Sequence, residues 1–137
     1  MLMNKFLRLS FVALLSFVYG NLFADVISEL SQPLRRLTDL GVHDVIIDPG
    51  FGFAKTLEQN YELFAHLAEF SVFNRPVLVG ISRKSMIYKL FNITPEQSLS
   101  ATTALNLLAL QSGASILRVH DVPEAVQMVA MHRQLSR

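Results

Sequence analysis

Three apolar runs in this sequence each end in side chains that can bind a polar ligand. These side chains are Asp48 after the run 45–47, Ser82, Arg83 and Lys84 after the run 76–81, and Arg118 and His120 at the end of the run 115–120. A carboxylate, a hydroxyl, an imidazole and cationic groups can together bind a flat polar ring and an anion attached to it.

The loop after Asp48 interleaves two glycines with two phenylalanines. An Asp-Pro-Gly triplet usually forms a turn, so Asp48 alone has a structural interpretation as well as a functional one. Gly50 and Gly52 let the backbone approach a ligand closely, and Phe51 and Phe53 can offer it a flat apolar wall. A carboxylate beside such a wall suits a heteroaromatic ring with an amidine-like edge, which it can bind through two hydrogen bonds.

The polar residues after the other two runs also allow two interpretations. Ser82-Arg83-Lys84 is an ordinary solvated loop if no ligand binds there. Beside a carboxylate, Lys84 can donate to ring acceptors, and Ser82 can bind an anion near a helix start. Arg118 and His120 lie two apart in a strand that is expected to be buried, so they face the same side and need a compensating anion. A lone histidine there would more often be structural, but the pair favours a phosphorylated ligand with a flat ring.

The spacing of apolar residues predicts the elements that position these side chains. We expect a helix at 22–40 that Pro33 kinks or splits and Gly41 ends, followed by a strand at 45–47. The next helix is expected to begin at the capping box Thr56–Gln59 and to continue through Leu67 and Ala68, ahead of a strand at 76–81 and a loop at 82–85. The last elements expected are a helix from Thr94 to Gly113, a strand at 115–120, and a helix that Asp121 and Glu124 cap and that ends near Gln134. Three strand-loop-helix units predict an α/β fold with parallel strands. Because parallel strands present their carboxyl ends at one rim, we expect the polar residues to lie together.

Composition limits the classes of protein to which the chain can belong. It has 137 residues, about half of them apolar, which is enough for one domain with a core. The formal net charge is +1 without blocks of like charge, so nucleic acid is not an expected partner. The lack of cysteine excludes thiolate zinc sites and agrees with a cytoplasmic location. Lys55-Thr56 does not complete a phosphate loop, since Pro49 replaces its first glycine.

Residues 1–18 form an atypical apolar segment ahead of the regular pattern. Lys5 and Arg8 precede the apolar run Leu9–Val18, a layout similar to a secretory signal, but the sequence at 22–24 is a poor cleavage site. The run is too short to cross a bilayer, so no membrane is expected as a partner. We expect an abnormal start rather than a secretion signal, followed by a domain at residues 19–137.

Three motifs resemble one enzyme family. The stretches DVIIDPGFGFAKTLEQNYEL, PVLVGISRKSMIYKL and ILRVHDVPEAV are similar, in order and spacing, to the last three strand segments of the pterin-binding dihydropteroate synthase family, which sulfonamides inhibit. The resemblance covers residues 19–134. It implies a (β/α)8 TIM barrel and Mg2+-dependent chemistry in folate biosynthesis. In the implied reaction, the amine of p-aminobenzoate displaces pyrophosphate from 6-hydroxymethyl-7,8-dihydropterin diphosphate to give dihydropteroate.

The resemblance also implies a role for each residue at the strand ends. Asp48, Gly80, Lys84 and Arg118 would bind the pterin, Phe53, Ser82 and Arg83 the p-aminobenzoate, and Arg118 and His120 the diphosphate. Catalysis would fall to Lys84, Arg118 and His120, which stabilise developing charge without a protein nucleophile. The family's metal-binding asparagine has no counterpart here, so no metal ligand is expected in this chain. The expected partners are these small molecules, and a homodimer is a further expectation.

Two departures from the family pattern affect these expectations. Ala54 stands where the family commonly has glycine, which would stiffen the loop. A full barrel takes about 250 residues, and only three strand-helix units are recognisable, so we expect the C-terminal part of a truncated barrel that shows no turnover alone. Two alternatives stay open. One is a methyltetrahydrofolate-binding methyltransferase, against which the motifs at 82–84 and 118–121 argue. The other is a non-catalytic fragment that pairs with a full-length enzyme.

Overall fold

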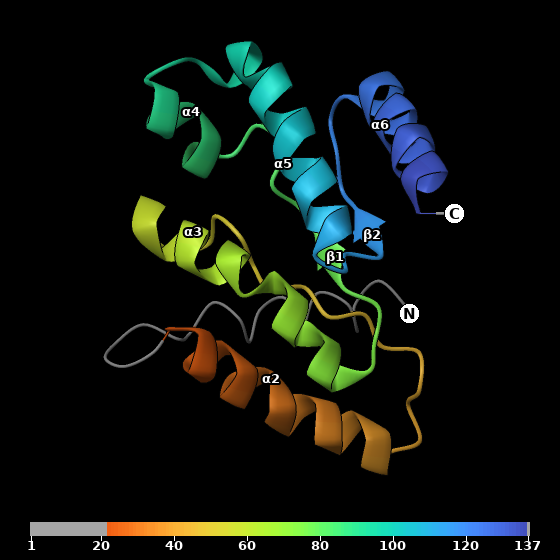
Figure 1. The fold of residues 1–137 in the computed structure, drawn as a ribbon. Coiled ribbons are helices and arrows are strands. Elements are labelled where there is room, and N and C mark those ends of the chain that lie inside the picture. The colour runs from red at the N-terminus through yellow and green to blue at the C-terminus, as the bar shows by residue number, and fades with distance from the viewer. Residues whose placement is uncertain (1–21, 137) are drawn as a thin grey trace.

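The computed structural model describes residues 22–136, so the segment 1–18 lies outside the described range. The elements in chain order are α2 (Leu22–Asp39), α3 (Leu57–Ala65), the 3-10 helix η1 (Leu67–Phe73), β1 (Leu78–Val79), α4 (Ser85–Phe91), the 3-10 helix η2 (Pro95–Ser98), α5 (Leu99–Gln111), β2 (Ile116–Leu117) and α6 (Val122–Leu135). Figure 1 shows the two short strands with α2 below them and α5 and α6 above them in this view.

A small parallel sheet organises the described part of the chain. The register of β1 and β2 pairs Leu78 with Ile116 and Val79 with Leu117, and a parallel bridge joins Ile47 to Val77. The N–H of Leu78 donates to Ile47 O at 2.7 Å, whereas the N–H of Arg118 donates to Val79 O at 3.0 Å. Each parallel segment is followed by a helix: Ile47 by α3, β1 by α4 and α5, and β2 by α6. The predicted α/β fold with three strand-helix units is confirmed.

The strands are shorter than the apolar runs that predicted them. The first run keeps only the bridge at Ile47, because the N–H of Val45 donates to the carbonyl two residues before it at 3.0 Å. Within residues 22–136, β2 pairs with β1 alone, and Ile116 is 37% exposed. The expectation that Arg118 and His120 lie in a buried strand is therefore wrong, and both residues are exposed.

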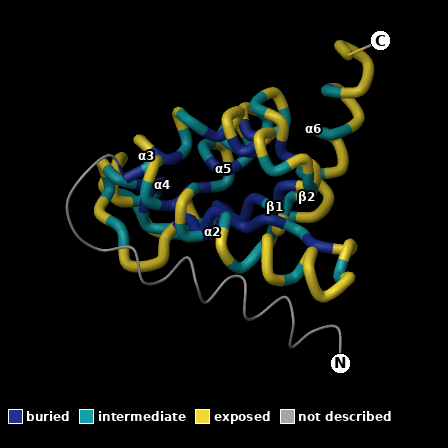
Figure 2. The backbone as a smooth tube through the Cα atoms, turned by 90° about the horizontal axis from the view of Figure 1, so that it is seen from below, coloured by how far each residue is buried: buried dark blue, intermediate teal, exposed yellow. Residues whose placement is uncertain are grey.

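The core lies between the parallel segments and the helices that pack on them, including α2, which precedes the first segment. Its largest fully buried side chains include Phe51, Phe70, Leu30, Ile47, Leu63, Ile81 and Met86. Figure 2 shows mostly exposed or intermediate residues along α6, and of the two strands only β1 contains a buried residue, Val79. Among the helices of residues 22–136, none is both long and apolar enough to cross a membrane.

Helix α2 passes through Pro33 without a break, so the expected split does not occur. Side chains before and after the proline pack on the same core, which holds the two halves of the helix in line. The helix ends at Gly41 as expected, where φ is 74°. The N–H of Gly41 donates to Thr38 O at 2.9 Å and the N–H of Val42 to Leu37 O at 2.8 Å, the paired bonds that close a helix before a left-handed glycine.

Helix α3 begins as expected and ends sooner. The side chain of Thr56 accepts from the N–H of Gln59, and the Gln59 side chain accepts from the N–H of Thr56, which confirms the capping box. The helix ends at Ala65, so Leu67 and Ala68 belong to η1 and do not continue α3.

Helix α4 occupies residues that the sequence pattern assigns to a loop and its continuation. Its N-cap, Lys84, makes no side-chain capping bond, and seven residues are too few for a clear helical period. The next expected helix start is confirmed at the Thr94 capping box, although the chain forms η2 before it enters α5. Helix α5 ends just before Gly113, also as expected.

Candidate functional site

Asp48 and Arg118 meet at the carboxyl end of the sheet. Arg118 Nη1 lies 3.7 Å from Asp48 Oδ2, which makes an ion pair too long for a hydrogen bond. Asp48 is 9% exposed, and its Oδ1 accepts from the N–H of Gly50 at 2.9 Å. The side chain of Arg118 is 55% exposed. The carboxylate is therefore held in place, while the guanidinium is accessible to a ligand.

Gly80, at the end of β1, makes room for Arg118. A Cβ at this position would stand 2.6 Å from Arg118 Nη2, 2.9 Å from its Nε and 3.0 Å from its Cζ. The guanidinium of Arg118 therefore packs against backbone that no side chain covers. This close approach gives a physical reason for glycine at a position that the resemblance assigns to the ring-binding site.

Lys84 connects the loop after β1 to the loop after Ile47. Its ammonium donates to Phe51 O and lies 4.7 Å from the centre of the Phe53 ring. Its aliphatic stem crosses Gly52, where an added Cβ would lie 2.8 Å from Lys84 Cδ. A cation over a ring face and a carbonyl acceptor both hold the positive charge in position.

The pKa of Lys84 makes the stability of the fold depend on pH. Burial, and after it Arg118, lowers this pKa from 10.5 to about 8 against the opposing effect of Asp48. Between about pH 8 and 10.5, the unfolded chain keeps a proton that the folded chain has lost, so stability rises with pH. Across this window, we expect the wild-type free energy of unfolding to gain about 1–2 kcal/mol relative to Lys84→Met, after allowance for solvent exposure.

Urea denaturation of the wild type and Lys84→Met at several pH values across this window measures the difference. Lys89→Met is the matched control, because Lys89 is an exposed lysine of the adjoining helix α4. Its stability is expected to follow that of the wild type with pH. Parallel curves for the wild type and Lys84→Met would contradict the prediction.

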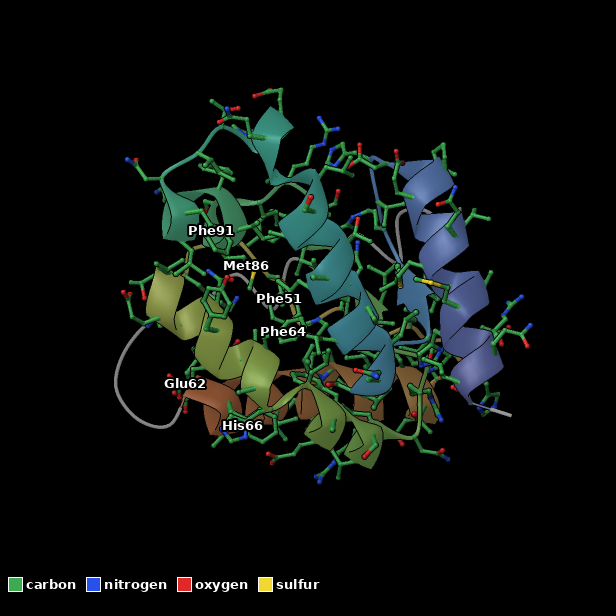
Figure 3. All side chains as sticks on the ribbon, turned by 45° about the horizontal axis from the view of Figure 1, so that its top comes forward. Phe51, Glu62, Phe64, His66, Met86 and Phe91 are labelled. Atoms are coloured by element: carbon green, nitrogen blue, oxygen red, sulfur yellow. The ribbon has the colours of Figure 1, made fainter. Side chains whose placement is uncertain are left out.

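The two phenylalanines of the loop occupy different environments. Phe51 is 0% exposed, and its ring centre lies 5.7 Å from that of Phe64 in α3. Figure 3 labels both side chains. Phe53 is 42% exposed and faces Lys84. The expectation that both rings form a ligand wall is wrong for Phe51, which anchors the loop in the core.

Two residues without an expected role hold this loop in place. Asn60 is 1% exposed, and its Oδ1 accepts from the N–H of Gly52 at 2.8 Å while its Nδ2 donates to the N-cap carbonyl of α3 at 2.8 Å. Lys55 Nζ donates to Gly50 O at 2.9 Å and Phe53 O at 3.2 Å, and burial lowers its pKa. The sequence feature that could have predicted this role for Asn60 is its position as an amide on the buried face of a short helix.

Ala54 lies in the left-handed region of backbone space, with φ at 49°. This conformation costs a residue with a Cβ about 1–2 kcal/mol, more than the entropy that alanine saves in the unfolded chain. We expect Ala54→Gly to raise the free energy of unfolding by about 0.5–1 kcal/mol in urea denaturation. Ala104→Gly, in the exposed middle of α5, is the control and should lower it by about 1 kcal/mol. A loss of stability in both variants would contradict the prediction.

Ser82 and His120 contact each other across the ends of β1 and β2. Ser82 Oγ accepts from the His120 N–H at 3.2 Å and lies 3.0 Å from its Nδ1. Ser82 is 4% exposed and lies two residues before Lys84, the N-cap of α4. Ser82 therefore lies near the start of α4, although Ser85 takes the first helical position.

Arg83 is paired with Asp121 and not with the other rim residues. Its Nε donates to Asp121 Oδ2 at 3.1 Å and its Nη2 to Asp121 Oδ1. The hydrogen bond from Arg83 lowers the pKa of Asp121, and the same bond raises the pKa of Arg83. Because its carboxylate is occupied in this way, Asp121 makes no side-chain cap on α6, contrary to expectation. Arg83 has a left-handed φ of 54°, and its N–H donates to Thr102 Oγ1 at 3.2 Å.

The rim as a whole suits an anionic ligand better than a metal ion. One buried carboxylate faces Lys84 and Arg118, and the exposed imidazole of His120 lies two residues beyond Arg118. Among residues 22–136, no group of three or more acidic or histidine side chains could hold a metal ion. These residues do not fit Mg2+, which prefers an octahedral set of oxygen ligands.

The residues at this rim lie within a segment that matches a known protein family. The model of the family described as pterin binding enzyme matches residues 11–120, a range that includes every rim residue from Asp48 to His120. The chain belongs to the pterin-binding enzyme family. The strand ends where polar side chains gather thus lie within the residues that match this family.

The pterin-binding relatives include enzymes of known structure. Dihydropteroate synthase of Escherichia coli strain K12 is 46% identical over 111 residues, which are 80% of this chain and 39% of that enzyme. Dihydropteroate synthase of Yersinia pestis, solved with a pterin–sulfa conjugate, aligns with a TM-score of 0.81 at 39% identity over 90% of this chain and 49% of its own. The Xanthomonas albilineans enzyme, solved with 4-aminobenzoic acid, aligns with a TM-score of 0.83 at 35% identity over 88% and 45%.

The extent of these matches defines what the chain shares with its pterin-binding relatives. It spans about two fifths of the curated Escherichia coli relative and about half of the solved structures. Those structures are (β/α)8 barrels, so the prediction that the described residues form part of such a barrel is confirmed. The resemblance to dihydropteroate synthases drawn from three sequence motifs is confirmed as well.

Proposed function

We propose that this chain carries part of the substrate site for the dihydropteroate synthase reaction of folate biosynthesis. The observation that supports this most directly is the grouping of Asp48, Lys84 and Arg118 at one rim, with the carboxylate buried and the guanidinium exposed. This set complements a flat ring with an amidine-like edge and an anionic substituent. The related enzymes solved with a pterin–sulfa conjugate and with 4-aminobenzoic acid support the same ligand classes.

Each rim residue has a role in this proposal. Asp48 accepts two hydrogen bonds from the amino-pyrimidine edge of the pterin. Lys84, with a pKa of about 8, is largely an ammonium at neutral pH and donates to ring acceptors. Arg118 lies over Gly80, covers the ring face and reaches the diphosphate. Phe53 contacts the p-aminobenzoate ring, and the carboxylate contacts assigned to Ser82 and Arg83 stay predictions, since both side chains have protein partners.

The proposed reaction needs no protein nucleophile. The amine nitrogen of p-aminobenzoate forms a bond to the exocyclic methylene carbon of the dihydropterin, and the bond from that carbon to the diphosphate oxygen breaks. The electron pair leaves with the diphosphate, and the secondary ammonium that forms first loses a proton to solvent to give the secondary amine. Arg118 and His120 stabilise charge on the departing diphosphate, which is electrostatic catalysis by groups already in place.

Ligand binding tests the proposal on the full chain. Titration with 6-hydroxymethyl-7,8-dihydropterin diphosphate, followed by pterin fluorescence, is expected to show saturable binding. Arg118→Met should weaken this ligand about 10- to 100-fold, because a charge-assisted bidentate contact to phosphate is lost. For the same pterin without its diphosphate, Arg118→Met should lower the affinity by a smaller factor.

The matched control is Arg133→Met, which removes an exposed arginine in the last turn of α6. It should bind like the wild type. Equal losses in the two variants would mean that net charge alone attracts the ligand. Tighter binding of methyltetrahydrofolate than of the diphosphate would favour the methyltransferase alternative and contradict the proposal.

A homodimer and a cytoplasmic location also stay predictions. The exposed apolar side chains of α6 support the first of these: Val122, Val126, Met131 and Leu135 are 56–79% exposed. Exposed apolar groups on one helix are typical of a surface that another chain covers. Sedimentation of the full chain over a range of concentrations would measure the oligomeric state.

A further inference from the structure

Ser82 places its hydroxyl against two nitrogens of one residue. Its Oγ accepts a hydrogen bond from the backbone N–H of His120 at 3.2 Å, and the imidazole Nδ1 of the same residue lies 3.0 Å away. Ser82 is 4% exposed, so water has little access to this hydroxyl. The position of every proton in this contact therefore depends on the two residues themselves.

The hydroxyl of Ser82 has one proton to donate and lone pairs to accept with. The backbone N–H of His120 occupies one lone pair. Among residues 22–136, Nδ1 of His120 is the acceptor that the hydroxyl proton can reach. If Nδ1 carried a proton instead, it would donate to Oγ and leave the buried hydroxyl proton without an acceptor, which costs about 1–3 kcal/mol. The arrangement that satisfies every group has the hydroxyl donating to an unprotonated Nδ1.

We propose that Ser82 is a positioning residue that fixes His120 as the Nε2–H tautomer. A neutral imidazole with an unprotonated Nδ1 carries its proton on Nε2, because the bond at one ring nitrogen determines the state of the other. His120 is exposed, so its Nε2–H is available to donate to an anion at the rim. This donor adds no charge beside Lys84 and Arg118. Identifying the anion as a diphosphate rests on the proposed function, whereas the tautomer does not.

Nitrogen NMR of the full chain with labelled histidine tests the tautomer directly. Long-range correlation spectra at mildly alkaline pH distinguish a proton-bearing ring nitrogen from a bare one. The chain has four histidines, and His120→Gln identifies the signals of His120 by their loss. The expected wild-type spectrum has a bare Nδ1 and a proton-bearing Nε2 at His120. A proton-bearing Nδ1 in the wild type would overturn the proposal.

Two substitutions at position 82 test whether the serine is responsible. Ser82→Ala should give averaged signals from both tautomers at His120, and Ser82→Thr, which keeps the hydroxyl, should restore the wild-type pattern. An unchanged His120 spectrum in a folded Ser82→Ala variant would also overturn the proposal. Inorganic pyrophosphate should shift the Nε2 signal of the wild type and bind about fivefold more weakly to Ser82→Ala. A bare Nδ1 with no response to pyrophosphate would support the tautomer and contradict the proposed ligand.

Discussion

Replacement of Phe51 by alanine is expected to lower the free energy of unfolding by about 3–5 kcal/mol. The ring is 0% exposed and packs against Phe64, so its removal leaves a cavity beneath the loop that follows Ile47. A domain of this size has about 5–15 kcal/mol of stability in total, so the variant should unfold at a much lower urea concentration. The midpoint of urea denaturation, followed by circular dichroism, measures the loss.

Phe53→Ala is the matched control for this prediction, since the two residues have the same type and lie two positions apart. Phe53 is 42% exposed and contacts the ammonium of Lys84, so its removal should cost less than about 1 kcal/mol. It should instead weaken the binding of p-aminobenzoate. A similar loss of stability in both variants would show that the two rings do not have the separate structural roles described here.

Asp48→Asn is expected to weaken the binding of the dihydropterin diphosphate about 30- to 100-fold. The amide has nearly the shape of the carboxylate and can still accept from the N–H of Gly50, so the loop should keep its conformation. The variant loses the charged acceptor for the amino-pyrimidine edge. It also removes the charge that raises the pKa of Lys84, so more of the lysine is neutral at a given pH.

The control for this charge change is Asp44→Asn, which removes an exposed carboxylate four residues earlier. Its affinity should match that of the wild type. Fluorescence titrations of the three proteins at low and high salt separate a local contact from long-range attraction, because salt screens only the latter strongly. If Asp48→Asn bound the ligand as tightly as Asp44→Asn, the assignment of the pterin edge to Asp48 would be wrong.

Features that depend on a few consecutive residues were predictable from the sequence. The capping box at Thr56 and the helix end at Gly41 rest on hydrogen bonds between neighbours in the chain. The shared rim was predictable as well, because parallel strands leave their carboxyl ends on one side. Asp48 and Arg118, 70 positions apart in the sequence, meet there at 3.7 Å.

Features that depend on distant partners were not predictable in the same way. Nothing near Asp121 in the sequence indicates that Arg83 will bind its carboxylate and prevent it from capping α6. The sequence does not distinguish the two phenylalanines of the loop, because each follows a glycine in the same short segment. The packing of Phe51 against Phe64 of α3 is what buries it. The lengths of the strands likewise depend on their neighbours in the sheet and not on the apolar runs themselves.

The crossing of Lys84 over Gly52 has a mechanical consequence. The stem of the lysine lies on the backbone of the neighbouring loop, and its ammonium is bonded to the carbonyl just before that glycine. Asn60 holds the same backbone from below through the N–H of Gly52. The segments 49–55 and 82–84 are therefore joined to each other at Gly52. We expect a ligand that displaces one of these segments to change the contacts of the other.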